Sequence, residues 1–276
     1  MTKIDFSVLM SVYEKENPEY LNLALNSIWM DQTVRPTEIV IVKDGVLPDD
    51  LESILFDFAQ KAPVKFVVNE NNMGLSASLN KGLMFCDNDL VARMDSDDIS
   101  SLNRFETQIN YITANKNVDI VGSWAQKIDN NGNEIGLLKV PLLDKDIKKL
   151  IWTCPFIHPT IIFNKKKLLS IGSYNPKSGP RQDDYELWFR CAANNFVFAN
   201  IDQTLLYYRF SSDNIKKNSI NVGWHRFKVG FNGCRKLNCS LIAYLGITVP
   251  LLRSLLPHPL DIYIYHLLNK INPRNR

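Results

Sequence analysis

The first 115 residues alternate short apolar runs with stretches in which apolar side chains recur every three or four positions. The runs have strand length and are largely apolar on both sides: Phe6–Val12, Glu38–Lys43, Lys65–Asn69 and Leu90–Met94. Helical spacing is found after Asn17-Pro18 and at Pro48–Lys61, Leu75–Cys86 and Asn103–Ala114. This order predicts a mostly parallel sheet with helices on both faces, because strands covered on both faces lack polar alternation.

The pattern is less regular after residue 115. Further strands are predicted at Val118–Ile128, Thr160–Phe163 and Thr204–Phe210. The polar tetrapeptide Asn130–Asn133 contains a glycine and predicts a hairpin turn, and Asp184–Ala193 predicts a helix. The chain therefore has an α/β first half and a second half in which the strand order cannot be read from the sequence.

Length and composition suit a folded α/β domain with an extension. The chain has 276 residues, of which 45% are hydrophobic and 22% charged. Five cysteines without a C-x-x-C pair favour a reducing compartment over a disulfide framework or a zinc site. The amino terminus has no cleavage site of small residues, so we expect no signal peptide.

Charge is distributed unevenly along the chain. Residues 216–276 contain ten Lys or Arg and one acid, a net charge of +9, which leaves −6 for residues 1–215 out of a total of +3. An acidic body with a basic end indicates two different partners, although a solvated basic face would look the same. Nucleic acid is not expected as a partner, because the body is acidic and no nucleic-acid-binding motif is present.

Polar side chains follow the predicted parallel strands. Tyr13 and Glu14 come after the first strand, Asp44 after the second and Asp95 after the fourth. Ligands of open parallel sheets bind beyond the carboxyl ends of the strands, so we expect these side chains to converge on one edge. The chain has no P-loop and no dinucleotide fingerprint, and it lacks the signatures of zinc proteases and serine hydrolases.

A carboxylate cluster provides the clearest candidate for metal binding. Asp95 and Asp97 are two residues apart, as in a D-x-D motif, and point the same way if the chain there is extended. Oxygen ligands of this kind suit Mg²⁺ or Mn²⁺ that also binds substrate phosphates. The alternative is a helix cap, because Asp98 precedes a predicted helix.

These motifs together resemble a known family. The chain looks like a family 2 glycosyltransferase with the GT-A fold, of the bacterial surface-polysaccharide type, over about residues 4 to 215. The resemblance rests on an ordered series of short motifs: FSVLMSVY from Phe6, Gln32-Thr33 with Pro36, EIVIVKDG from Glu38, Asn72-Met73-Gly74-Leu75, Asn80-Lys81-Gly82, MDSDD from Met94, Arg104 with Gln108, His158-Pro159-Thr160, DYELW from Asp184, and Tyr208-Arg209. Leu79 and Leu102 depart from the pattern, where some relatives carry Arg and Pro.

The resemblance implies roles on the donor side. Ser11 and Tyr13 would lie against the base and ribose of the nucleotide, and Asp44 would accept a hydrogen bond from the base, usually uracil. Asn80, in a motif of the same half, would also bind the nucleotide sugar. Asp95 would face the ribose or the sugar.

It also implies roles for the metal and the acceptor. Asp97 would bind Mn²⁺ or Mg²⁺, and Asp184 matches the general base that deprotonates the acceptor. Asp183 beside it leaves open which carboxylate acts. The remaining candidates are placed on the acceptor side or near the metal without an assigned role: Asp98, His158, Trp188 and Arg209. Three aromatic residues are interpreted either as sugar-stacking or as core residues: Trp152, Phe156 and Trp188.

The implied enzyme is an inverting, metal-dependent hexosyltransferase. We expect transfer of galactose or glucose from a UDP-sugar to a polyprenyl diphosphate-linked sugar in O-antigen or other lipopolysaccharide or surface-polysaccharide biosynthesis. The expected domains are a GT-A catalytic domain at 1–215, with a Rossmann-like nucleotide-sugar half at about 1–115 and an acceptor half at 116–215, and a helical extension at 216–276. The alternatives are a nucleotidyltransferase acting on sugar phosphates and a non-catalytic nucleotide-sugar binder.

The apolar part of the extension is too short to predict a membrane-spanning helix. Leu237–Leu252 has 16 uncharged residues and is interrupted by Gly246 and Pro250, whereas a spanning helix needs about 20. Basic residues before it and the apolar stretch Ile262–Leu268 after it suit a segment lying in the membrane interface. A helical pair docked on the catalytic domain is the alternative. With a lipid-linked acceptor, we expect a peripheral protein at the cytoplasmic face of the inner membrane.

Overall fold

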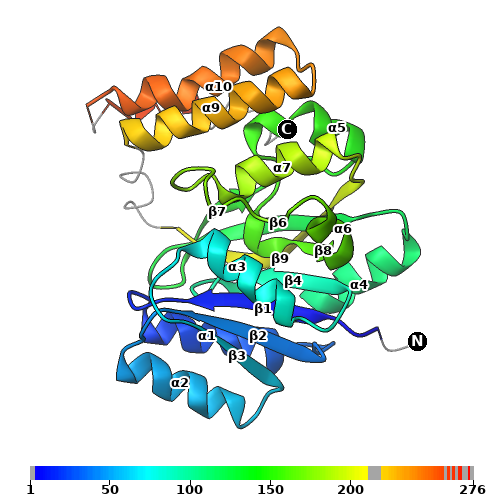
Figure 1. The fold of residues 1–276 in the computed structure, drawn as a ribbon, viewed down its shortest axis with the longest axis vertical. Helices are drawn as coiled ribbons and strands as arrows, with labels where there is room; N and C mark the ends of the chain where they lie inside the picture. Colours follow the sequence, from blue (N-terminus) through cyan, green and yellow to red (C-terminus); the bar gives the residue numbers. More distant parts are fainter. Residues whose placement is uncertain are drawn as a thin grey trace.

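The computed structural model describes residues 4–210 and 219–257, together with residues 260, 261, 263, 264, 267, 268 and 273. Within these residues one nine-stranded sheet crosses the molecule in the order β3-β2-β1-β4-β8-β6-β9-β5, and β7 pairs with β6 outside this path. Helices cover both faces (Figure 1). The predicted α/β class with a mostly parallel sheet is confirmed.

The first half is a run of parallel strands joined by helices. Its elements are β1 (Ser7–Val12), α1 (Pro18–Trp29), β2 (Glu38–Asp44), α2 (Asp49–Ala59), β3 (Val64–Asn69), α3 (Leu75–Phe85) and β4 (Leu90–Met94). β1 lies between β2 and β4 and is parallel to both, so the three strands end at one edge. Asn17 begins α1 as predicted, because its side chain accepts hydrogen bonds from the backbone N–H groups of Glu19 and Tyr20.

The second half mixes strand directions. Its strands are β5 (Ile99–Ser100), β6 (Ile120–Ile128), β7 (Glu134–Leu138), β8 (Ile162–Asn164) and β9 (Phe198–Arg209). Its helices are α4 (Arg104–Ala114), α5 (Asp144–Lys149), α6 (Lys165–Ser170), α7 (Asp183–Ala193) and the 3-10 helices η1 (Ile151–Thr153) and η2 (His158–Thr160). β8 runs antiparallel between β4 and β6, whereas β6 and β9 are parallel.

Two predicted boundaries in this half are wrong. Residues predicted as the start of a strand at Thr160 form η2, and β8 begins only at Ile162. The Thr160 hydroxyl donates to the carbonyl of Ile157, and its own carbonyl accepts from Gln108, so local and side-chain bonds replace the strand ladder. β9 also begins earlier than predicted, at Phe198. The predicted turn between β6 and β7 is confirmed, with Gly132 at φ 85°.

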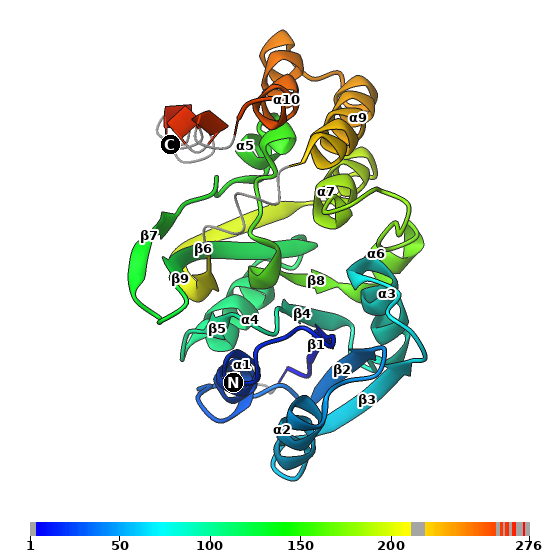
Figure 2. The ribbon, with the colours of Figure 1, turned by 90° about the vertical axis from the view of Figure 1, so that its left-hand side faces the viewer.

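The sheet separates two hydrophobic cores. Alternate residues of β1 point to opposite faces: Leu9 packs in the core beneath α3 and α7, and Val8 and Met10 pack against α1, α2 and α4. Figure 2 shows the helices divided between the two faces in this way. Helices are needed on both faces of the sheet, because the side chains of β1 are buried on both faces.

Two C-terminal helices form an antiparallel pair at the end of the molecule opposite α2 (Figures 1 and 2). α9 (Ile220–Lys236) packs on α7, and α10 (Leu241–Ser254) packs on α9 and η1. Glycines make the approach close: a Cβ at Gly233 would lie 2.3 Å from the ring of Phe189, and one at Gly246 would lie 1.9 Å from the ring of Trp152. The pair is therefore docked on the body, as one of the two interpretations of the extension expected.

Parts of the extension lie outside the described residues. These include the basic residues Lys216, Lys217, Lys270, Arg274 and Arg276 and part of the apolar stretch 262–268. In the portion that is described, no helix has the length and apolar character needed to cross a bilayer.

Candidate active site

Three carboxylates gather where β4 ends. Asp95, Asp97 and Asp98 each offer an oxygen, and these atoms lie within 4.8 Å of one another. β4 is parallel to β1 with Met94 beside Met10, so Ser11 and Tyr13 follow at the same edge of the sheet. The pKa of Tyr13 is raised by burial and by neighbouring acids that include Asp97. The predicted convergence of the strand-end residues is therefore observed for β1 and β4.

The cluster is held by two arginines. Arg93 is fully buried on β4 and forms an ion pair with Asp95. Arg209, at the end of β9, donates its backbone N–H to Asp98 at 2.8 Å and its guanidinium to the carbonyl of Asp97 at 2.9 Å. The same guanidinium stacks 3.8 Å above the ring of Tyr20. Arg209 thus fixes the backbone of the acidic turn, and its placement beside the cluster agrees with its position in the sequence motif.

Burial and mutual repulsion work against ionisation of the cluster. Burial, with the charge of Asp95, raises the pKa of Asp97 to about 6. Burial, with Asp97 and Asp95, raises the pKa of Asp98 well above its usual range. Among the described residues, no hydrogen-bond partner reaches the buried Oδ2 of Asp98. Clustered carboxylates with an unsatisfied oxygen fit a divalent cation, which would supply the missing positive charge.

A second pair of carboxylates begins α7. Asp183 accepts a hydrogen bond from the Ser76 hydroxyl at the start of α3, and burial raises the pKa of Asp183. Asp184 uses Oδ1 to accept from the backbone N–H of Tyr185 at 2.8 Å and Oδ2 to accept from the thiol of Cys154 at 3.3 Å. Cys154 has φ 62°, a left-handed conformation that few residues other than glycine adopt. The backbone beside Asp184 is therefore strained in a way that brings a thiol to its carboxylate.

The charge of Arg93 acts on both acidic groups. It lowers the pKa of Asp97 in the turn after β4 and of Asp183 at the start of α7, partly offsetting the effect of burial. It also acts on Tyr174, whose hydroxyl lies 2.8 Å from Nε2 of the buried His158. Burial, followed by the Arg93 charge, lowers the pKa of His158 well below its usual range, so the imidazole is neutral. The sequence analysis did not single out Arg93, although an arginine inside an apolar strand was a visible signal.

On the donor side, two predicted residues also hold the local backbone. The Asp44 carboxylate accepts from the Asn69 amide at 2.9 Å and from the backbone N–H groups of Met73 and Gly74 at 2.7 and 3.0 Å. The Asn80 amide exchanges hydrogen bonds of 2.8 and 2.9 Å with the backbone of Tyr174. The Asp44 contacts shape the loop before α3, and those of Asn80 hold the segment between α6 and α7. The predicted nucleotide contacts of Asp44 and Asn80 stay predictions.

The aromatic candidates separate into core and surface residues. Phe156 and Trp188 are buried and pack together with ring centroids 4.8 Å apart, and His158 lies 5.9 Å from Trp188. The core interpretation accounts for Phe156 and Trp188. Trp152 instead lines a pocket.

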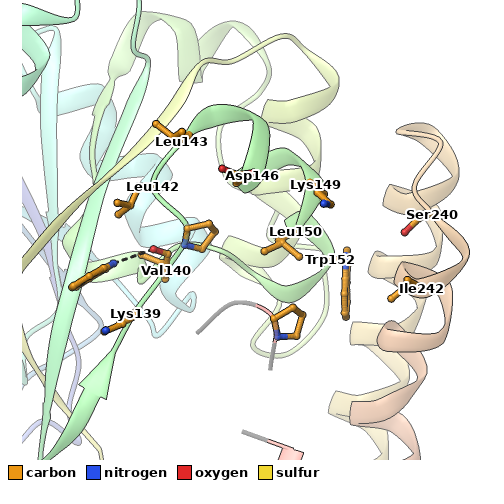
Figure 3. A pocket seen from close by; sticks show the side chains of 13 residues that line it. Lys139, Val140, Leu142, Leu143, Asp146, Lys149, Leu150, Trp152, Ser240 and Ile242 are labelled. Carbon is orange, nitrogen blue, oxygen red and sulfur yellow. Dashed lines mark hydrogen bonds between the residues drawn. The ribbon is translucent and has the colours of Figure 1, made fainter. Parts of the chain in front are cut away.

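That pocket has a volume of about 730 Å³ and lies between the β7–α5 connection and α10 (Figure 3). Its apolar wall includes Leu150, Trp152 and Ile242, and Lys139 and Lys149 also line it, together with Asp146. The carbonyl of Trp152 accepts a hydrogen bond of 2.9 Å from the Tyr185 hydroxyl, one residue beyond Asp184. η1 thus connects the pocket to the first turn of α7.

Comparison with known sequences identifies relatives over most of the chain. A sequence model described as "Glycosyl transferase family 2" matches residues 7–172. The chain is 34% identical over 269 residues to the UDP-Gal:alpha-D-GlcNAc-diphosphoundecaprenol beta-1,3-galactosyltransferase of Escherichia coli, with 94% of each chain covered. It is 37% identical over 224 residues to the amylovoran biosynthesis glycosyltransferase AmsE of Erwinia amylovora, with 81% of this chain and 82% of that one covered.

Solved structures share the fold. TarS 1-349 of S. aureus in complex with UDP-GlcNAc has a TM-score of 0.66 at 18% identity, covering 91% of this chain and 72% of that one. The Pyrobaculum calidifontis mannosyltransferase PcManGT, in complex with GDP-Man and Mn²⁺, has a TM-score of 0.67 at 14% identity, covering 96% and 79%. At such identities the likeness establishes the GT-A fold alone. The family model spans more than half of the chain and the two sequence relatives exceed 30% identity over most of it, so the chain belongs to glycosyl transferase family 2 and is a glycosyltransferase.

Proposed function

We propose that this enzyme transfers a hexose, galactose or glucose, from a UDP-sugar to a sugar carried on a polyprenyl diphosphate, with inversion at the anomeric carbon. The proposal draws its substrates from the E. coli relative, whose name specifies UDP-Gal and a diphosphoundecaprenol-linked acceptor and whose match covers 94% of both chains. A role in O-antigen or another surface polysaccharide follows from the same relative and from AmsE.

The donor would lie along the edge formed by β1 and β4. Ser11 and Tyr13 line this edge beside the acidic turn, Asp44 holds the loop that precedes α3, and Asn80 on α3 holds the backbone of Tyr174. Asp95 is oriented by its ion pair with Arg93, which leaves it suited to accept hydrogen bonds from ribose or sugar hydroxyls. Nucleotide and sugar are then bound by residues whose positions are already fixed.

Asp97 and Asp98 are the residues that would hold Mn²⁺ or Mg²⁺. Their raised pKa values and the unsatisfied Oδ2 of Asp98 support this assignment. When bound, such an ion stabilises negative charge on the departing diphosphate.

Asp184 would accept the proton. As the acceptor oxygen bonds to the anomeric carbon, the bond from that carbon to the diphosphate breaks, UDP departs and the hydroxyl proton passes to the Asp184 carboxylate. Cys154 and the Tyr185 N–H orient this carboxylate from behind, and Asp183 is bound to Ser76. We assign Asp184 rather than Asp183 as the base from its position in the sequence motif.

The acceptor would be reached from the second half of the fold. His158, Trp188 and Arg209 support this side as buried or backbone-holding groups rather than as stacking surfaces. We retain a catalytic domain at 1–215 and an extension at 216–276 as the proposed division. A lipid-linked acceptor implies a peripheral position at the cytoplasmic face of the inner membrane.

The observation that carries the proposal is the cluster of Asp95, Asp97 and Asp98 where β4 ends, beside the residues that follow β1 at the same edge of the sheet. The family match favours glycosyl transfer over nucleotidyl transfer. The experiment is a panel of nucleotide sugars with a synthetic sugar-diphospholipid acceptor, with and without Mn²⁺. Transfer from UDP-galactose or UDP-glucose that requires the metal supports the proposal, and release of a nucleoside monophosphate would contradict it.

A further inference from the structure

The α9–α10 hairpin carries an unusual set of charges for a surface element. Residues 219–254 contain five Lys or Arg and no Asp or Glu. Two of the five are engaged by their neighbours, because Arg226 lies 4.1 Å over the ring of Tyr185 and Arg253 is 2.7 Å from Asp261. The other three, Lys228, Arg235 and Lys236, are exposed on α9. The hairpin therefore presents an uncompensated positive surface.

α10 adds an aliphatic stripe to this surface. Leu241, Leu245 and Leu252 lie on one side of the helix, at 82%, 71% and 58% exposure. Thr248 falls on the same stripe, and its hydroxyl is bonded to the carbonyl of Leu245. The opposite side of α10 carries Ala243 and Ile247, both buried against the body. The exposed leucines are therefore not needed for docking α10, and they face away from the core.

Aromatic rings join the two helices of the hairpin. Trp224, Phe227, Phe231 and Tyr244 form a chain of contacts, with successive ring centroids 5.7, 5.9 and 5.8 Å apart. Trp224 and Phe231 belong to α9 and are 44% and 42% exposed, and the Lys228 ammonium lies 5.1 Å from the Trp224 ring. We use the name hairpin face for these exposed residues: Leu241, Leu245, Leu252, Trp224, Phe231, Lys228, Arg235 and Lys236.

We propose that the hairpin face docks on an anionic lipid bilayer and inserts its leucines and aromatic rings at the membrane interface. Tryptophan and phenylalanine beside lysine and arginine suit the level of the headgroups, and the basic side chains attract an anionic leaflet. α10 has 14 residues, which is too short to span the hydrocarbon, so it would lie along the interface.

A second copy of the chain is a weaker candidate for the occupant. In a two-fold symmetric dimer the hairpin face would meet a copy of itself, so its three basic residues would face an equally basic surface. Like charges opposed across an interface are unfavourable. The charge of the hairpin face therefore favours an anionic surface over self-association.

Docking of this kind would also orient the candidate active site. The inner side of the hairpin rests on α7, where Gly230 and Gly233 approach Tyr185 and Phe189. α7 begins with Asp183 and Asp184, and Ile242 of α10 lines the pocket beside η1 (Figure 3). The relation to a lipid-linked acceptor rests on the proposed function, whereas binding to vesicles does not.

The test is flotation of the full chain with phosphatidylcholine vesicles that contain or lack phosphatidylglycerol. We expect the protein to float with the anionic vesicles and to dissociate as salt is raised. The double variant Leu241→Asp/Leu245→Asp should lower the partition coefficient at least about tenfold, because each exposed leucine loses its transfer into the interface. A triple Gln variant at Lys228, Arg235 and Lys236 should remove the preference for anionic vesicles.

Phe56→Asp is the matched control, since Phe56 is 65% exposed on α2 at the far end of the molecule. It should float like the wild type. Absence of wild-type flotation, or equal flotation of the leucine variant, would overturn the proposal, as would a dimer that the leucine variants convert to monomer. If the protein binds vesicles but transfers no sugar, the proposed function fails and the docking surface stands.

Discussion

The two acidic groups of the site differ in how their charges are satisfied. Asp97 and Asp98 crowd together with raised pKa values, and Asp98 has an unsatisfied buried oxygen. Asp184, in contrast, has both oxygens engaged, by the Tyr185 N–H and by the Cys154 thiol. The comparison teaches that carboxylates of one fold can be left crowded and short of donors or can be supplied with them, depending on the backbone and side chains around them.

The largest effect is expected from removing the proposed proton acceptor. Asp184→Asn should lower kcat about 10²–10⁴-fold, because the amide cannot take the acceptor proton. UDP-sugar affinity should stay near that of the wild type, since Asp184 is proposed to act on the acceptor hydroxyl and not to bind the donor. Steady-state kinetics and calorimetric titration with UDP would check this. Asp183→Asn is the matched control and should retain more activity, and the reverse order would transfer the base assignment to Asp183.

Removing the proposed metal ligand Asp97 should slow transfer because the departing diphosphate of the donor loses charge stabilisation. Asp97→Asn is expected to lower kcat/KM about a hundredfold, the size of losing a few kcal/mol of charge stabilisation. Mn²⁺ should raise the melting temperature of the wild type and of Asp184→Asn, but not of Asp97→Asn. Differential scanning fluorimetry with and without Mn²⁺ measures this difference. A Mn²⁺ response that survives in Asp97→Asn would argue against the assignment.

The same substitution should stabilise the protein without metal. The pKa of Asp97 is raised in the folded state, so the folded state binds more protons and stability falls as pH rises from about 4 through 6. Asp97→Asn should therefore increase the free energy of unfolding by up to about 2 kcal/mol at pH 7.5 and by much less at pH 4. Urea titrations in EDTA at the two pH values would measure it. A variant less stable than the wild type at pH 7.5 would show that the repulsion in the cluster is already relieved.

The smallest effect on activity is expected from replacing Cys154, whose thiol donates to the Asp184 carboxylate. Cys154→Ala removes a weak thiol donor to Asp184 and should lower kcat about fivefold or less, because the carboxylate loses a positioning hydrogen bond. Cys154→Ser should restore kcat. Cys154→Gly should lose the donor but gain stability, because glycine adopts φ 62° without strain. Equal kcat values for the alanine and serine variants would leave the thiol without a positioning role.

The first half of the fold was predictable because its rules are local. Continuous apolar strands and the cap at Asn17 determine β1 to β4 and α1, and the parallel order then brings Ser11 and Asp95 to one edge. The second half was not predictable, because β8 pairs antiparallel with β4 and β6, two strands that are distant from it in sequence. No local pattern records such pairings.

The candidate site was predictable as a list of acids and not as a set of contacts. The motif at Asp95–Asp98 and the pair Asp183-Asp184 could be read directly, but Arg93 acquires its role only when the fold buries it against Asp95. Cys154 likewise depends on a left-handed backbone angle that its residue type does not suggest. Asp44 and Asn80 hold loop backbone in addition to any contact with nucleotide.

Two glycines of the α9–α10 hairpin fix the distance between the hairpin and the body. Where Gly233 and Gly246 meet Phe189 and Trp152, backbone rests on ring with no flexible side chain between them. The height of the first turn of α7 above the outer side of α10 is then fixed by helix diameters rather than by rotamers. With the proposed acceptor anchored to the membrane by its polyprenyl diphosphate, this rigid contact would hold the first turn of α7 at a constant distance from the membrane surface. A methyl group added at Gly246 would change that distance.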